Sequence, residues 1–397
     1  MMSVWSSLVG QEAAVAKLSE AAASARAIVA SRGGAHASDD ARSMSHAWLI
    51  TGPPGSGRSV AARAFAAALQ CTGETVGCGA CAGCRTTMGR TNADVVFAAT
   101  ETSIINVETA RSLVLQAQSS PSQGLWRVIV VEDADRLGES GANALLKAIE
   151  EPPEHTVWLL CAPSPEDMIA TIRSRCRHLG LRIPTAAAVA DLLVREDVAT
   201  PEVALDAARA AQSHIGLARA LARDPQMRER RRAIITAPAS VRSVGEAVMA
   251  ADRLLETAKA QADAQVSERN AREKAELMRQ LGMDEGESAP KASRMMIRQL
   301  EEDQKRRSKR ALTDAIDRAL IDLLAIYRDV LMVQVGGDGE LINTDLSDLV
   351  HEIAQDSTPR QTLVRVDHIE TARKRLVSNG NPLLVLEEMA ISLRPQA

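Results

Sequence analysis

The sequence predicts an α/β fold in which a parallel sheet covered by helices is followed by an all-helical region. A short apolar run leads into a glycine-rich loop, TGPPGSGRS at residues 51–59, which opens a helical segment. Short apolar runs then alternate with helical segments as far as Pro184, and the periodicity beyond it is helical. Aromatic residues make up only 2% of the chain and alanine is abundant, which favours helices over large β-sandwiches.

The first half of the chain supplies the predicted sheet. Residues 12–23 form the first expected helix, and the unperiodic stretch 25–43 is expected to be a surface loop or insertion. The strand HAWLI at 46–50 precedes the glycine-rich loop, and a helix follows it over residues 59–70. Further strands are expected at residues 94–98, 127–131 and 156–162. Strands that alternate with helices indicate a parallel sheet with helices on both faces.

The second half is expected to be helical. Residues 186–223 form a small helical unit, and helices continue from about residue 228. The unusually charged stretch 256–310 predicts long solvated helices, with a flexible elbow at 282–290. One basic cluster is interpreted as a solvated face, with a DNA-facing role as the less favoured alternative: Lys305, Arg306, Arg307, Lys309 and Arg310.

Length and charge restrict the possible functions. With 397 residues the chain can form two or three domains. A net charge of −4 gives no global attraction to nucleic acid, so a contact with DNA would be local or shared with partner chains. No segment approaches the roughly 18 apolar residues of a membrane span, and the N-terminus lacks a signal-peptide pattern. We therefore expect a cytoplasmic protein without membrane contact.

The glycine-rich loop has the form of a phosphate-binding loop. A strand that turns sharply into a helix points backbone N–H groups and the positive helix end at one spot, where phosphates bind. A tight turn without a ligand is the alternative. The residues expected to contact nucleotide are Gly52, Pro53, Pro54, Gly55, Ser56, Gly57, Arg58 and Ser59.

Two departures argue against hydrolysis at this loop. Arg58 stands where such loops carry lysine, and a planar guanidinium is bulkier than the ammonium that reaches the β- and γ-phosphates. Ser59 could still offer its hydroxyl to Mg²⁺. After the strand at 127–131 come Glu132 and then Asp133, the reverse of the usual order, which alters the reach of both carboxylates. Binding of ATP or ADP with Mg²⁺ stays open.

Four of the six cysteines, Cys71, Cys78, Cys81 and Cys84, lie within 14 residues. Four thiolates at this spacing can close a tetrahedral Zn²⁺ site with no open position, so such a zinc would be structural. A disulfide pair and an iron–sulfur cluster are the alternatives. Cys161 and Cys176 are expected to be ordinary buried residues.

These features together resemble the AAA+ subunits of bacterial sliding-clamp loaders, and among them the delta-prime type of DNA polymerase III. The resemblance spans most of the chain. It rests on LVGQEAA near the start, HAWLITGPPGSGRS, the four-cysteine module, GANALLKAIEEPPEHTVWLL, IRSRC at residues 172–176 and ARKRLVSNGNPLLVLEEMAISL near the C-terminus.

The resemblance implies three domains. Residues 1–182 would be an AAA+ P-loop domain with a zinc module at 71–84, and residues 183–228 a helical lid. Residues 229–397 would be a helical collar for oligomerisation, expanded at about 256–310. The implied partners are gamma/tau-type and delta-type subunits in a hetero-pentamer, with the sliding clamp and primed DNA reached through the complex.

The resemblance also assigns roles to single residues. Arg175 of the SRC motif would be an arginine finger that enters the ATP site of a neighbouring subunit, where a guanidinium stabilises developing charge. Arg219 would be the sensor-2 arginine. Active motors carry threonine in the sensor-1 turn, where this chain has Ala162 and Pro163, with Ser164 displaced.

Three hypotheses follow. The favoured one is a delta-prime-like subunit that supplies a finger but hydrolyses little or no ATP alone. The second is an active gamma/tau-like motor that has accommodated Arg58 and the reversed acids. The third is a zinc-containing AAA+ protein that acts outside replication.

Overall fold

The computed structural model describes residues 3–31, 43–98, 105–281 and 291–394. They divide into two compact units, Met1–Arg219 and Ala220–Ala397. None of the helices in these described ranges has the length and apolarity that crossing a membrane requires.

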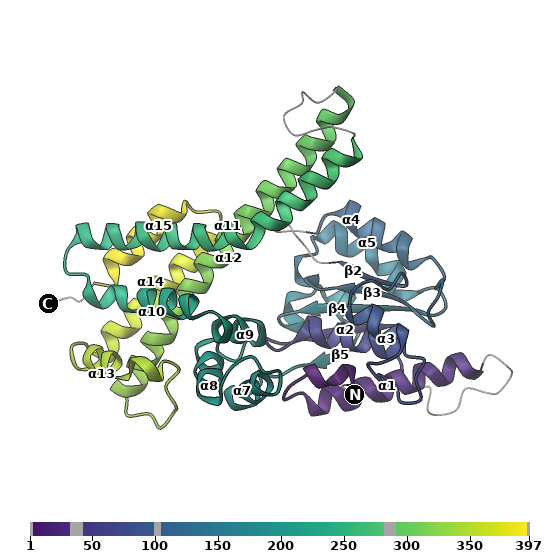
Figure 1. The fold of residues 1–397 in the computed structure, drawn as a ribbon, viewed down its shortest axis with the longest axis horizontal. Helices are drawn as coiled ribbons and strands as arrows, with labels where there is room; N and C mark the ends of the chain where they lie inside the picture. Colours follow the sequence, from purple (N-terminus) through teal and green to yellow (C-terminus); the bar gives the residue numbers. More distant parts are fainter. Residues whose placement is uncertain (1–2, 32–42, 99–104, 282–290, 395–397) are drawn as a thin grey trace. The chain divides into compact units, whose positions relative to one another are not determined.

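A five-stranded parallel sheet in the order β2-β3-β4-β1-β5 forms the centre of the first unit (Figure 1). The strands are β1 Ala47–Thr51, β2 Val95–Ala98, β3 Arg127–Val131, β4 Thr156–Ala162 and β5 Arg177–Gly180. Every residue of β1 and β4 is buried, as expected for parallel strands covered on both faces. The predicted α/β fold is therefore confirmed, with β3 and β4 at the predicted residues. β5 was not predicted.

Helices cover the sheet on both sides. They are α1 Glu12–Ala30, α2 Arg58–Leu69, α3 Ala82–Met88, α4 Val107–Ala117, α5 Glu139–Glu150 and α6 Ala170–Arg173, with the short 3-10 helices η1 Val4–Ser7, η4 Ala134–Arg136 and η5 Pro165–Asp167. Side chains of α1 and α2 fill one core, in which Trp48 meets Phe65 edge to face at 5.3 Å. Side chains of α4 and α5 fill the core on the other face.

The first helix is longer than predicted. α1 extends to Ala30, because Ala21, Ala22 and Ala25 are fully buried against the core that α2 shares. Much of the loop expected at 25–43 lies outside the described residues. After the sheet come the small helices α7 Ala186–Arg195, α8 Pro201–Ala210 and α9 Ile215–Arg223.

The second unit is helical, as predicted. Its elements are α10 Pro225–Ser240, α11 Val244–Gln280, α12 Lys291–Gln334, η6 Thr344–Leu346, α13 Ser347–Gln355, α14 Pro359–Val377 and α15 Pro382–Ser392. The middle of α12 buries Leu320, Leu323 and Ile326 against Ile369 of α14 and Leu386 of α15. A buried polar cluster joins α10 to α12, since Arg231 Nε donates to Asp322 Oδ1 at 3.1 Å.

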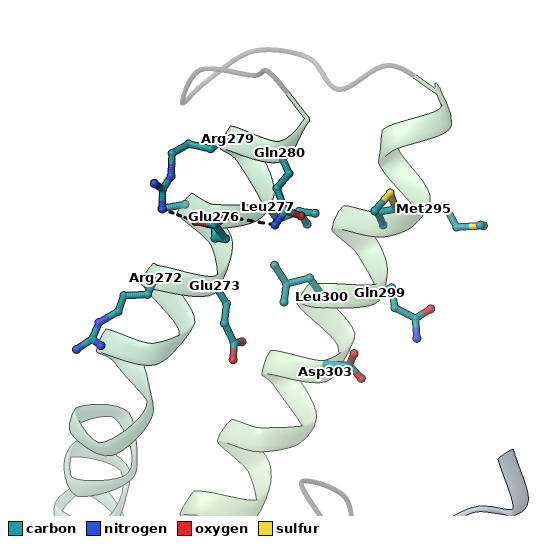
Figure 2. A pocket seen from close by; sticks show the side chains of 12 residues that line it. Arg272, Glu273, Glu276, Leu277, Arg279, Gln280, Met295, Gln299, Leu300 and Asp303 are labelled. Atoms are coloured by element: carbon teal, nitrogen blue, oxygen red, sulfur yellow. Dashed lines mark hydrogen bonds and ion pairs between the residues drawn. The ribbon is translucent and has the colours of Figure 1, made fainter. Parts of the chain in front are cut away.

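The distal halves of α11 and α12 run side by side beyond the other helices of this unit (Figure 1). Arg307 of the basic cluster donates to Asn270 Oδ1 at 2.7 Å and Glu273 Oε2 at 2.9 Å, and so ties the two helices together. The long helices predicted in 256–310 are confirmed, whereas the expected elbow at 282–290 lies outside the described residues. Near their ends, Leu277, Met295 and Leu300 line an open groove (Figure 2).

Candidate nucleotide site and metal centre

The glycine-rich loop connects β1 to α2 at the carboxyl edge of the sheet. Gly55 and Gly57 have φ of 90° and 89°, a left-handed conformation that costs other residues free energy. No side chain caps the N-terminus of α2, so its first N–H groups are open to a ligand. The loop therefore has the backbone that phosphate binding requires.

The loop is packed closely on its surroundings. Gly52 N–H donates to the Pro163 carbonyl at 3.1 Å. A Cβ on Gly52 would lie 2.5 Å from Ser56 Oγ, and one on Gly55 would lie 2.9 Å from the Cα of His214, just before α9. Side chains at these two positions would displace the loop, which explains why the sequence has glycine there.

Two polar atoms of the loop fit an anionic ligand. Ser56 Oγ and Arg58 Nη1 are buried and have no hydrogen-bond partner within the described part of the chain. Buried donors without partners are costly, and phosphate oxygens would satisfy them. The phosphates of ATP or ADP thus fit the loop, and the predicted contact residues 52–59 lie together in it.

The predicted acidic pair lies at the end of β3, but Glu132 is already paired. Its Oε1 accepts from Arg90 Nη2 at 2.5 Å, and its side chain is only 13% exposed. Asp133 caps η4. A nearby carboxyl, Asp135, has its pKa raised by burial and by Asp133, with Arg136 and Arg58 opposing the rise. Because a guanidinium holds the first of the two predicted acids, Mg²⁺ does not fit this arrangement as it stands.

Sequence reasoning missed Arg90 and Asp135. Arg90 lies 42 positions before Glu132, so no local pattern connects them. Asp135 stands two residues after Asp133, within the acidic run, and this spacing could have drawn attention to it.

The turn after β4 offers its backbone to the loop. Pro163 supplies the carbonyl that Gly52 N–H reaches. Ser164, the nearest hydroxyl in sequence, caps η5 instead: its Oγ donates to Glu166 Oε2 at 2.8 Å and accepts from Glu166 N–H at 3.2 Å.

Arg175 follows α6 and is exposed, with 37% of its side chain accessible. Its guanidinium pairs with Glu150 at the end of α5, and Nη1 donates to the Thr171 carbonyl at 2.7 Å. Arg219 on α9 makes a two-pronged contact with Glu196 Oε2, at 3.0 Å from Nε and 2.6 Å from Nη2. Both arginines therefore pair with residues at the ends of helices, Arg175 with Glu150 of α5 and Arg219 with Glu196 just after α7.

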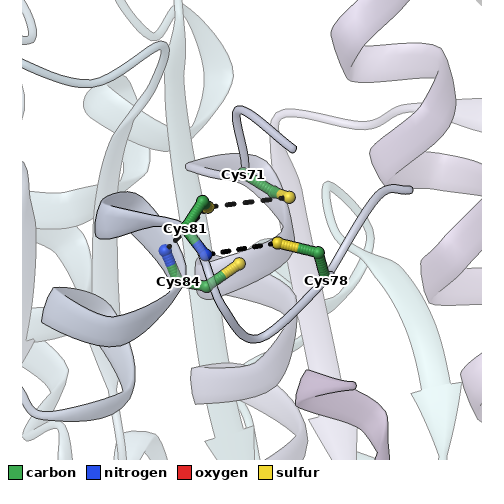
Figure 3. Close-up of side chains that lie close together, drawn as sticks. All are labelled: Cys71, Cys78, Cys81 and Cys84. Carbon is green, nitrogen blue, oxygen red and sulfur yellow. Dashed lines mark hydrogen bonds between the residues drawn. The ribbon is translucent and has the colours of Figure 1, made fainter. Parts of the chain in front are cut away.

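The four cysteines converge between α2 and α3 (Figure 3). Their Sγ atoms all lie within 4.8 Å of one another, and those of Cys71 and Cys81 are 3.9 Å apart. All six cysteines of the chain are free thiols. A tetrahedral zinc with Zn–S bonds of about 2.3 Å separates its sulfurs by about 3.8 Å. The set fits structural Zn²⁺ held by Cys71, Cys78, Cys81 and Cys84.

The backbone around the cysteines supports such a site. Cys84 N–H and Cys81 N–H donate to the sulfurs of Cys81 and Cys78, each at 3.4 Å. Burial opposes ionisation of Cys81, but N–H donation from Cys84 and Thr72 outweighs it and lowers the pKa to about 5. A Cβ on Gly73 would lie 2.8 Å from Cys78 Sγ, so glycine leaves the sulfurs their space. Such a zinc would stabilise the module and leave no position for catalysis.

Comparisons with known proteins found similarities to subunits of DNA polymerase III. Residues 36–185 match the family described as DNA polymerase III, delta subunit. A gamma/tau subunit of DNA polymerase III from Mycobacterium tuberculosis is 35% identical over 159 residues, 39% of this chain and 28% of that protein. A delta' subunit from Pseudomonas aeruginosa is 34% identical over 165 residues, 41% of this chain and 50% of that protein.

A solved structure from Thermotoga maritima, described as a DNA polymerase III gamma subunit-related protein, aligns with 88% of this chain and 93% of that one. Its identity is 16% and its TM-score 0.42.

The parallel sheet and the glycine-rich loop that follows β1 give the first unit the form of a P-loop α/β domain. Residues 36–185 of this unit are similar to the family described as DNA polymerase III, delta subunit. The chain spans 28% of the length of the gamma/tau relative and 50% of the length of the delta' relative. These two relatives carry different subunit names.

Proposed function

We propose that the chain is a delta-prime-like subunit of the DNA polymerase III clamp loader that hydrolyses little or no ATP alone. The observation that carries the proposal is at the end of β4. In the active clamp-loader motors that the sequence resembles, a threonine hydroxyl stands there. Here the Pro163 carbonyl accepts from Gly52 N–H and the Ser164 hydroxyl is bonded to Glu166. A carbonyl can accept but cannot donate a proton to a phosphate oxygen.

In this proposal Arg175 acts in trans, as the finger for the ATP site of the neighbouring subunit. Its exposure and its position after the conspicuous α5 motif NALLKAIEEPP support that role. The contact with Glu150 joins two surface side chains, and such a pair costs little to exchange for a phosphate. Arg219 is proposed as the sensor-2 arginine, which would have to leave Glu196 to reach a nucleotide.

The remaining parts receive roles in the same assembly. Residues 183–228 would be the lid and residues 229–397 the collar that holds gamma/tau-type and delta-type subunits in a hetero-pentamer. The sliding clamp and primed DNA would be reached through that complex, in the cytoplasm. A zinc at the four cysteines would stiffen the segment between α2 and α3.

ATP turnover of the purified full chain tests whether its own nucleotide site hydrolyses ATP. We expect no turnover above a buffer control, both for the wild type and for Arg58→Lys, because the lysine alone does not restore the sensor hydroxyl. Clear turnover by the wild type would favour the alternative of a gamma/tau-like motor, which the 35% identity to gamma/tau supports.

A pull-down separates the replication role from the third hypothesis. The full chain should retain gamma/tau-type and delta-type subunits from purified mixtures. Failure to retain either would indicate an AAA+ protein that acts outside replication.

A further inference from the structure

We propose that Arg90 keeps Mg²⁺ away from Glu132, and that the cysteine module positions Arg90 for this role. The inference deepens the proposed function and rests on it, since it explains how the chain's own nucleotide site is kept silent. It assigns to the module an effect on the nucleotide site in addition to local stability.

The backbone of Arg90 is fixed by the helix that carries two of the cysteines. Cys81 caps α3 through its sulfur, and Cys84 lies in the first turn. At the other end, Arg90 N–H donates to the Thr87 carbonyl at 3.0 Å and Thr91 N–H to the Thr86 carbonyl at 2.8 Å.

Arg90 itself has φ of 59°, which is unfavourable for a residue with a Cβ and persists only where the surroundings impose it. Anything that holds α3 in place therefore holds Arg90 in place.

The side chain reaches from the module to the acidic edge of the sheet. Its Nη2 lies 2.5 Å from Glu132 Oε1, and its guanidinium lies 5.0 Å from the ring centroid of Phe97 on β2. Both contacts orient the guanidinium. Glu132 is held as well, because its N–H donates to the Ala98 carbonyl at 3.0 Å.

A second cation, Arg63, interacts electrostatically with the same carboxylate. Arg63 on α2 has a buried Nε without a hydrogen-bond partner in the part of the chain that the structure describes. Burial lowers the pKa of Arg63, the positive charge of Arg90 lowers it further, and the negative charge of Glu132 opposes both. Glu132 thus already has compensating charge beside it.

This arrangement is unfavourable for Mg²⁺. The ion needs near-octahedral oxygen ligands and binds through one or two carboxylates. At Glu132 it would have to displace a charge-assisted hydrogen bond and place two further positive charges beside Arg90 and Arg63. Nucleotide that enters the loop would therefore bind with an affinity that does not depend on Mg²⁺.

Nucleotide titrations of the full chain test the proposal. ADP and ATP are titrated into wild type, Arg90→Ala and Arg85→Ala, each in buffer with Mg²⁺ and in buffer from which Mg²⁺ is left out, without a chelator that would remove zinc. Arg85→Ala is the matched control, because it removes an exposed arginine from the same helix. We expect Mg²⁺ to change the affinity by less than about twofold in the wild type and the control, and to tighten it about tenfold in Arg90→Ala.

Either of two results would overturn the proposal. One is a wild type that already binds about tenfold more tightly with Mg²⁺. The other is an Arg90→Ala protein whose response to Mg²⁺ equals that of Arg85→Ala, including the case in which neither binds nucleotide. Melting curves and zinc content show whether each variant is folded, and Arg90→Lys, which keeps the charge, should stay close to the wild type.

The two proposals fail differently. ATP turnover by the isolated wild type would contradict the proposed function. If the wild type does not turn over ATP and Mg²⁺ leaves the nucleotide affinity of Arg90→Ala unchanged, only the role of Arg90 is contradicted.

Discussion

Asp94→Asn is expected to destabilise the first unit by about 3 kcal/mol. Asp94 follows the cysteine module in the sequence and directly precedes β2. Its carboxylate is fully buried. Its Oδ1 accepts from Ser122 N–H at 2.6 Å and Ser122 Oγ at 2.9 Å, and its Oδ2 accepts from Gln123 N–H at 2.8 Å and Gly124 N–H at 2.6 Å. This single side chain therefore anchors the turn before β3.

The magnitude follows from these bonds. Asparagine keeps one oxygen for Ser122 but turns an NH₂ group toward the N–H groups of Gln123 and Gly124. Two hydrogen bonds to a charged acceptor are lost, at about 1.5–3 kcal/mol each, and partial relaxation brings the sum to about 3 kcal/mol. In a unit of this size that lowers the melting temperature by about 6–12 °C.

Thermal and urea unfolding of the full chain measure the effect, with a probe that follows the first unit. Asp191→Asn on the exposed face of α7 is the matched control, and we expect it to stay within about 0.5 kcal/mol of the wild type. If Asp94→Asn and this control unfold at the same temperature and the same urea concentration, the reasoning about the buried carboxylate is wrong.

The same carboxylate has a predictable pH dependence. Burial raises the pKa of Asp94, but N–H donation from Ser122, Gln123 and Gly124 outweighs it and leaves the pKa below its usual value. A lowered pKa in the folded state stabilises the fold at pH values above the unfolded pKa of about 3.9, and this contribution is lost as the pH falls through the folded pKa. The stability difference between wild type and Asp94→Asn should therefore be constant near neutral pH and shrink below about pH 4.

Two further predictions concern the metal centre and the second unit. Freshly purified, reduced protein should contain close to one Zn²⁺ per chain by elemental analysis. Cys84→Ser should lose most of this zinc, whereas Cys176→Ser should keep it. A wild type without zinc would contradict the predicted metal centre. Asp322→Ala should lower the free energy of unfolding in urea by about 3–5 kcal/mol, because it removes an ion-pair partner from buried Arg231. Asp345→Ala breaks an exposed ion pair and should lower it by less than about 1 kcal/mol. Similar losses in the two variants would contradict the burial argument.

The parts of the fold that could be predicted are those with a strong local pattern. β3 and β4 each contain a continuous buried apolar run, and the cysteine spacing alone indicated a convergent site. β5 reads RHLG and lies at the sheet edge, paired only with β1, so three of its four residues are exposed and no apolar run marks it. Its position depends on pairing with β1, which local sequence does not encode.

The candidate site shows the same division. The loop and Glu132 could be predicted because each follows a recognisable strand. The pairing of Glu132 with Arg90 could not, because it depends on how the segment after the cysteines folds back onto the end of β3. Likewise Arg175 was identified by its motif, but its contact with Glu150 became visible only once α5 and α6 were placed together.

The most direct test of a silent subunit that supplies a finger is ATP turnover by a reconstituted clamp loader in which only this chain carries Arg175→Ala. Arg173→Ala, an exposed arginine on α6, is the matched control. We predict that hydrolysis at the neighbouring site falls by about 10³-fold or more, so that its share of the turnover disappears while the complex still assembles. Equal turnover by the Arg175→Ala and Arg173→Ala complexes would contradict the account.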